Sequence, residues 1–152
     1  MLTYDQYLTS VSLPACTTIG KYTFAWCSKL TTVSLPACTS IGSSAFYNCT
    51  SLTTVSLPLV SYIGNIAFSS AAFTSISVPS CISIGESAFY FCKSLKSIYL
   101  MSTKLCTLAH SNAFSYCTAL SYIYVKSTLL TKYKSATHWT YFSAKMYSYT
   151  NS

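Results

Sequence analysis

Residues 30–49, LTTVSLPACTSIGSSAFYNC, decide the fold, because most of the chain consists of copies of this stretch. The preceding copy is LTSVSLPACTTIGKYTFAWC at residues 8–27, and the following copy is LTTVSLPLVSYIGNIAFSSA at residues 52–71. One apolar anchor of the copies recurs at steps of 22, 22, 21, 22 and 25 residues, as Val11, Val33, Val55, Ile76, Ile98 and Ile123. A repeat of this period is typical of a solenoid.

Each copy divides into three segments with different patterns. LTTVSLP alternates like a half-buried strand, so Val33 and Leu35 are expected to point inward and Pro36 to end the strand. ACTSIG is expected to be a turn-like crossing that buries Ile41 and turns at the glycine. SSAFYNC fits one turn of an α- or 3₁₀-helix that buries Phe46.

Glycine and proline support this division, because each occurs at one place in the repeat. The four glycines all follow the isoleucine of the crossing, as Gly20, Gly42, Gly64 and Gly85. The four prolines all follow the strand, as Pro14, Pro36, Pro58 and Pro79. Residues with special backbone properties therefore lie only where the repeat requires them.

The pattern Leu-x-x-Val-x-Leu-Pro followed by Ile-Gly-x-x-Ala-Phe-x-x-Cys resembles the BspA-type leucine-rich repeat. The resemblance covers roughly residues 8–125. It implies an α/β-type repeat solenoid, with one parallel strand in each of about five coils of 21–25 residues. It also implies a surface or secreted protein that functions in adhesion and binding rather than in catalysis.

The chain is expected to form one domain, with a lead-in at residues 1–7, repeats at 8–125 and a C-terminal cap at 126–152. A cap is required because the last coil would otherwise expose its core. It is predicted to contain a helix at about residues 128–136, followed by an aromatic cover. One phenylalanine per coil is expected to stack inside the solenoid: Phe24, Phe46, Phe68, Phe89 and Phe114.

The composition is unusually poor in charge, with 7% charged and 51% hydrophobic residues. No uncharged apolar run approaches the roughly 18 residues of a membrane-spanning helix, so no such segment is predicted. The net charge of +7 fits either an acidic partner or the solubility of a surface rich in hydroxyl groups. Because the chain has no arginine, nucleic acid is not an expected partner.

The first residues, MLTYDQYLTS, lack the basic and long apolar regions of a signal peptide. They fit a fragment of a longer surface protein, a mature form, or a protein released by another route. The resemblance nevertheless implies a location at the cell surface or outside the cell.

The eight cysteines fall at two positions of the repeat. One group follows the strand (Cys16, Cys38, Cys81 and Cys106), and the other follows the Ala-Phe pair (Cys27, Cys49, Cys92 and Cys117). In the third copy these positions hold Val60 and Ala71, which indicates small buried sites where free cysteine packs as a hydrophobe. A reduced core ladder is expected, with some disulfides or a metal site as alternatives. No cofactor is expected.

Catalysis is not predicted, because a histidine base would need an acid to orient it. The two acidic residues, Asp5 and Glu86, belong to different copies from His110 and His138. Packing within the cap explains His138, and the proximity of Cys106 to His110 in sequence fits a coincidence of spacing.

The outward positions of the strands predict the binding surface. They form two rows: Ser10, Thr32, Thr54, Ser75, Ser97 and Tyr122 in one, and Ser12, Ser34, Ser56, Ser77, Tyr99 and Tyr124 in the other. Lys96 and Lys126 lie nearby in the sequence. Tyr99, Tyr122 and Tyr124 suit the recognition of protein or sugar, or they reflect the strand propensity of tyrosine.

The sequence therefore predicts a non-catalytic adhesion module that recognises a protein or glycan partner through its strand face. The alternative is a self-assembling structural solenoid, or a segment of a longer repeat array. In that case an open first coil would associate end to end with another copy.

Overall fold

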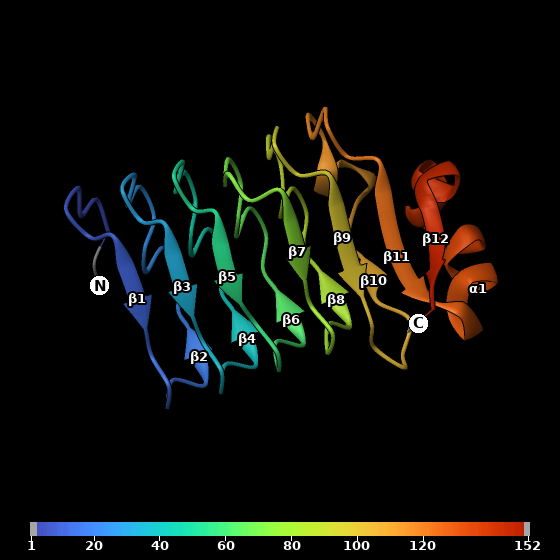
Figure 1. Cartoon of the computed structure of the whole chain (residues 1–152), viewed down its shortest axis with the longest axis horizontal. Helices are drawn as coiled ribbons and strands as arrows, with labels where there is room; N and C mark the ends of the chain where they lie inside the picture. Colours follow the sequence, from blue (N-terminus) through green and yellow to red (C-terminus); the bar gives the residue numbers. More distant parts are fainter. Residues whose placement is uncertain (1–2, 151–152) are drawn as a thin grey trace.

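A computed structural model describes residues 3–150 of the chain. The outermost two residues of the predicted lead-in and of the predicted cap, 1–2 and 151–152, lie outside the described residues. The coils lie side by side in chain order, and the helical cap α1 stands at the C-terminal end (Figure 1). This arrangement is a repeat solenoid with parallel strands, as the sequence predicts.

The longer strand of each coil lies where the alternating pattern predicts it. These strands are β1 (Ser10–Ser12), β3 (Thr32–Ser34), β5 (Thr54–Ser56), β7 (Ser75–Ser77), β9 (Ser97–Leu100) and β11 (Tyr122–Lys126). The repeat sets the register, because Val11 pairs with Val33 and Val33 with Val55. Val33 and Leu35 are buried, so the predicted inward positions are confirmed.

Each of the first five coils also contains a second short strand, so the expectation of one strand per coil is incomplete. These strands are β2 (Thr18–Ile19), β4 (Ser40–Ile41), β6 (Tyr62–Ile63), β8 (Ser83–Ile84) and β10 (Thr107–Leu108), and they form one continuous parallel sheet. They occupy the segment that was expected to be a turn-like crossing. Two residues are too few for an alternating pattern, so only the pairing between coils identifies them as strands.

The glycines allow the backbones of neighbouring coils to approach closely, and they are not needed for an unusual backbone conformation. None of the four has a positive φ. A Cβ atom added to Gly64 would lie 2.6 Å from Ser43 N and 2.7 Å from Gly42 C, both in the preceding coil. Only hydrogen fits at this position, because the contacting atoms belong to the backbone.

The segment around each buried phenylalanine is a succession of tight turns in the first four coils, so the predicted helical turn is wrong there. Two residues per coil have left-handed φ angles, such as 55° at Ser44 and 58° at Asn48. A helix cannot continue through such residues. Only the fifth copy has a 3₁₀-helix, η1 (Ser111–Phe114).

The predicted phenylalanine ladder is confirmed. All five rings are buried, and successive ring centroids are 5.3, 5.2, 5.8 and 5.3 Å apart. The longest step separates Phe68 from Phe89. Phe73 packs edge-on against both rings at this step, with centroid distances of 6.0 and 6.2 Å.

Phe73 coincides with a break in the strand face. It stands where other coils have leucine, in the copy that is one residue shorter, and it is completely buried. Among the described strands, β5 and β7 have no ladder pairing, so the longer strands form two sheets, β1-β3-β5 and β7-β9-β11-β12. The break in the strand ladder therefore falls at the copy that is one residue shorter and that carries Phe73.

The cap consists of η2 (Ser127–Leu129), α1 (Leu130–Ser135), η3 (Trp139–Lys145) and β12 (Met146–Tyr149). Together, η2 and α1 occupy the segment where the sequence predicts a helix. The indole N–H of Trp139 donates to Cys106 O at 2.7 Å, and the Cys106 backbone N–H donates to the Tyr133 hydroxyl at 2.8 Å. Both aromatic residues are fully buried, so they anchor the cap to the fifth coil.

The last strand, β12, was not predicted. It pairs in parallel with β11, where Tyr124 aligns with Tyr147 and Lys126 with Tyr149. It therefore covers the edge that β11 would otherwise expose and extends the strand face by one strand.

Candidate functional site

The structure brings the three predicted tyrosines together on one face. Tyr99 and Tyr124 are register partners in β9 and β11, and their rings stack with centroids 4.9 Å apart. Tyr122 stacks on Tyr124 with centroids 5.9 Å apart. Parallel in-register strands produce this contact, because equivalent outward residues in neighbouring strands lie about 5 Å apart.

Two further tyrosines join them from β12, and sequence reasoning missed both. The Tyr147 ring lies 5.6 Å from the Tyr122 ring, and the Tyr149 ring lies 5.9 Å from the Tyr99 ring. The alternation in MYSY, residues 146–149, was a weak signal for a strand. It lies beyond the last repeat, however, so the sequence did not indicate which strand it pairs with. The tyrosine cluster is defined here as Tyr99, Tyr122, Tyr124, Tyr147 and Tyr149.

The tyrosine cluster is accessible to a large partner. Tyr122, Tyr147 and Tyr149 are 45%, 45% and 42% exposed, while Tyr99 and Tyr124 are half-buried. Desolvation, followed by the neighbouring phenol groups, raises the pKa of Tyr124 above its usual value. This hydroxyl therefore keeps its proton at neutral pH and can both donate and accept hydrogen bonds.

The two predicted lysines lie at opposite ends of the tyrosine cluster. Lys96 is exposed directly before β9, and Lys126 is the half-buried last residue of β11. Among residues 3–150, the lysines placed over aromatic rings are Lys21, above Tyr22, and Lys93, above Phe91. Lys96 and Lys126 thus flank the tyrosine rings without stacking on them.

Seven of the eight cysteines are buried. Three of those that follow the phenylalanine donate to the phenylalanine carbonyl of the preceding coil: Cys49 to Phe24, Cys92 to Phe68 and Cys117 to Phe89. These bonds, 2.9–3.1 Å from sulfur to oxygen, give the thiol a role between coils that alanine cannot fill.

The structure predicts that one thiol reacts much faster than the others. Cys16 is the only partly exposed cysteine. Burial raises the pKa of the Cys49 thiol to about 12, so this group stays protonated near neutral pH, and the reagent also cannot reach its sulfur. Ellman's reagent at mildly alkaline pH should therefore label one thiol quickly and the others only after denaturation. Cys16→Ser should remove the fast phase. Several fast thiols in the folded protein, or missing thiols after denaturation without reductant, would contradict this prediction.

Metal-binding side chains do not gather in residues 3–150. This part of the chain has no group of three or more His, Cys, Asp or Glu residues placed to hold a metal ion. His110 and His138 do stack, with ring centroids 5.5 Å apart, a proximity that the sequence did not reveal. Asp5 accepts hydrogen bonds from the backbone N–H groups of Tyr7 and Leu8. Glu86 accepts from Asn112 Nδ2, and the Asn112 backbone N–H donates to His110 Nδ1, so Asn112 links this acid to the histidine pair.

The apolar residues belong to the solenoid core. One contiguous cluster of buried side chains runs from Val11 in the first coil to Met146 in the cap. None of the helices within residues 3–150 is sufficiently long and apolar to cross a bilayer.

Comparisons with known proteins agree with this architecture. The family model for the BspA type leucine rich repeat region matches residues 4–141 in six copies. No curated protein matches the chain. Proteins of leucine-rich repeat families are generally not enzymes, and the repeat supports a binding or structural role.

Two crystal structures are similar to the whole solenoid. A leucine rich cell surface protein of Faecalibacterium prausnitzii A2-165 has 26% identity and a TM-score of 0.66, over 89% of this chain and 35% of that protein. A leucine-rich repeat protein of Bacteroides ovatus ATCC 8483 has 23% identity and a TM-score of 0.65, over 95% of this chain and 43% of that protein. The chain thus spans less than half the length of either protein, and the second similarity concerns the fold alone. With its repeats, its coils and the family match over most of its length, the chain belongs to the BspA type leucine rich repeat family.

Proposed function

We propose that the protein is a non-catalytic binding and adhesion module of a surface or secreted protein, and that its tyrosine cluster recognises a protein or glycan partner. The supporting observation is the concentration of five tyrosine rings from three adjacent strands on one end of the strand face. The first strands present serine and threonine at the equivalent positions, so strand propensity alone does not explain why the aromatic residues cluster.

The chemistry of the tyrosine cluster suits a broad partner surface. Tyrosine offers a large apolar area, a hydroxyl group and few rotatable bonds, so its immobilisation on binding costs little entropy. Ring contacts within the cluster restrict these side chains further before any partner arrives. Lys96 and Lys126 at the two ends can attract acidic groups of a partner, as can the net charge of +7.

The cell-surface location rests on similarity. One similar crystal structure is described as a leucine rich cell surface protein, and we extend that location to this chain. Adhesion follows because repeat solenoids provide extended binding surfaces without catalytic groups.

Replacing three tyrosines of the cluster should weaken binding while preserving the fold. The variant Tyr99→Ser/Tyr122→Ser/Tyr124→Ser carries the residues that earlier coils have in the same rows. In an array of host-matrix proteins and glycans, its affinity for the strongest wild-type ligands should fall roughly tenfold or more, as for hot-spot tyrosines. Thermal unfolding should confirm that the variant is folded.

Two exposed tyrosines outside the cluster provide the matched control. Tyr7 and Tyr141 are 91% and 73% exposed. Tyr7→Ser/Tyr141→Ser should bind every ligand as the wild type does. If the cluster variant also retains wild-type affinity for all ligands, the tyrosine cluster is not the binding surface.

End-to-end association is the second candidate, and the first coil favours it. In the described residues, β1 pairs with β3 on one side only. Leu8, Leu13 and Cys16 of this coil are only partly buried, whereas Leu35, equivalent to Leu13, is fully buried. Light scattering at rising protein concentration should then show growing particle mass. A constant monomer mass would exclude self-assembly of this chain.

A further inference from the structure

A second aromatic surface lies on the side of the solenoid formed by the tight turns. There the two residues that follow each buried phenylalanine differ between coils: Ala25-Trp26, Tyr47-Asn48, Ser69-Ser70, Tyr90-Phe91 and Ser115-Tyr116. Four coils thus contribute large rings, and the third contributes two serines. This irregularity is unrelated to the strand face and to the tyrosine cluster.

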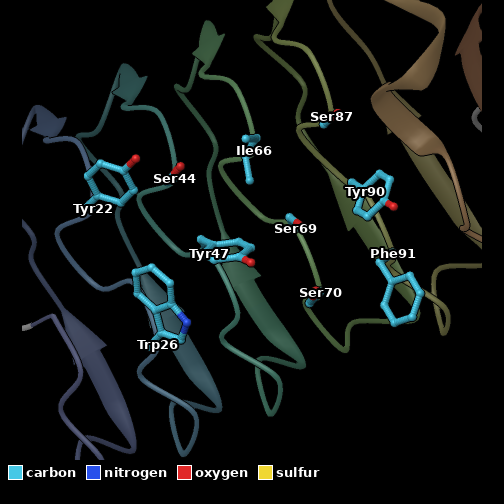
Figure 2. A pocket seen from close by; sticks show the side chains of 10 residues that line it. All are labelled: Tyr22, Trp26, Ser44, Tyr47, Ile66, Ser69, Ser70, Ser87, Tyr90 and Phe91. Atoms are coloured by element: carbon cyan, nitrogen blue, oxygen red, sulfur yellow. The ribbon is translucent and has the colours of Figure 1, made fainter.

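The serine pair creates a groove between two aromatic walls, which we call the turn-face groove. Its volume is about 620 Å³. Tyr47 and Trp26 form one wall, with ring centroids 4.8 Å apart, and Tyr90 and Phe91 form the other, with centroids 6.2 Å apart (Figure 2). Ser69 and Ser70 lie between the walls (Figure 2).

The spacing of the coils sets the width of the groove. Neighbouring coils are about 5 Å apart, so the rings of the second and fourth coils are separated by about 10 Å. A flat ring in van der Waals contact on both faces needs about 7–8 Å between two aromatic walls. One ring-shaped group of a ligand therefore fits across the third coil.

Two serine hydroxyls in this groove are available to a ligand. Ser44 and Ser69 are 5% and 2% exposed, and neither hydroxyl takes part in a protein hydrogen bond within residues 3–150. Because no buried side-chain nitrogen or oxygen in this part of the chain lacks a hydrogen-bond partner, both hydroxyls are open to the solvent in the groove. The third buried polar residue, Ser102, does accept a hydrogen bond, from the Lys104 backbone N–H at 3.1 Å. Because Ser44 and Ser69 line the groove, a ligand there can replace the water at these two hydroxyl groups and form hydrogen bonds with them.

The lining of the groove contains no charged side chain. Lys21 and Lys93 lie beside it, over the Tyr22 ring and the Phe91 ring, with Nζ 5.0 and 4.2 Å from the ring centroids. A neutral ligand with apolar ring faces and many hydroxyl groups matches aromatic walls and a serine floor. A sugar ring in the pyranose form has both properties.

We propose that the turn-face groove binds a neutral oligosaccharide, with one sugar ring between the aromatic walls and its hydroxyl groups on Ser44 and Ser69. A smaller hollow of about 260 Å³ shares Ser70 and Phe91 with the groove. It offers space for a neighbouring sugar, which favours an oligosaccharide over a single sugar. This site is independent of the proposed function of the tyrosine cluster.

Tryptophan fluorescence provides a direct test. Trp26 lines the groove, whereas Trp139 is fully buried in the cap, so a bound sugar should change the emission of Trp26 alone. We would titrate the whole chain with cellohexaose, mannohexaose and xylohexaose, and with a heparin hexasaccharide as the anionic comparison. At least one neutral hexasaccharide should bind with a Kd of about 1 mM or lower.

Two variants alter the groove by introducing residues that neighbouring coils already carry: one fills the groove, and the other removes one of its aromatic walls. Ser69→Tyr introduces the residue of the second and fourth coils, and Tyr90→Ser/Phe91→Ser introduces the pair of the third coil. Each should weaken sugar binding roughly tenfold or more. Variants of the tyrosine cluster should bind the sugar as the wild type does, which separates the two sites.

Several results would overturn the proposal. They are the absence of binding by every neutral hexasaccharide, binding by heparin alone, or wild-type affinity in both groove variants. Because Ser69→Tyr and Tyr90→Ser/Phe91→Ser change the groove in opposite ways, failure of one to fold leaves the other as a valid test. Thermal unfolding establishes which variants are folded.

Discussion

Replacing Phe46 by alanine should lower the free energy of unfolding by roughly 3–5 kcal/mol. Phe46 is fully buried and is stacked on both sides, 5.3 Å from Phe24 and 5.2 Å from Phe68. Truncation removes both contacts and leaves a cavity in the middle of the ladder. The coils on either side are held by their own strand pairing, so they have little freedom to close the gap.

Phe91→Ala is the matched control for this measurement. Its ring is 40% exposed on the turn face, so truncation removes little buried area and should cost less than about 1 kcal/mol. Chemical denaturation of both variants and the wild type gives the comparison. Equal losses in the two variants would show that the phenylalanine ladder does not stabilise the solenoid more than a surface ring does.

Replacing Gly64 by alanine should destabilise the fold by about 3 kcal/mol, although it adds only one methyl group. The new Cβ would lie 2.6–3.0 Å from Ser43 N, Gly42 C and Ile41 O. All three are backbone atoms, so no side-chain rotation relieves the clash and the two coils must separate. Separation also weakens the hydrogen bond from the Gly64 N–H to Ile41 O, which is 2.8 Å long.

Gly20→Ala tests the same substitution without a preceding coil. The nearest atom to the added Cβ is Thr23 Oγ1 at 3.3 Å, the end of a side chain. The free energy of unfolding of this variant should lie within about 0.5 kcal/mol of the wild-type value, as is usual for a surface substitution. If Gly20→Ala and Gly64→Ala lose the same stability, close approach between coils is not the reason for glycine at this position.

The sequence by itself determined the solenoid, its register and its core. When the same residue type recurs at one position of the repeat, that position has the same environment in every coil. Val33, Leu35 and Phe46 could therefore be assigned to the interior from the pattern alone. The same redundancy predicted where the outward tyrosines Tyr99, Tyr122 and Tyr124 would lie, since residues one repeat apart are neighbours in space.

Only the tertiary structure decided the features that break the repeat or follow it. The strand ladder breaks between β5 and β7, at the copy that carries Phe73. Tyr147 and Tyr149 reach the tyrosine cluster because the cap returns a strand beside β11. The walls of the turn-face groove come from different repeat positions in different coils. A periodic pattern describes what the coils share, whereas these features depend on how one coil differs from its neighbours. The effect of such a difference depends on which side chains of the neighbouring coils it contacts, and only the stacked structure shows those contacts.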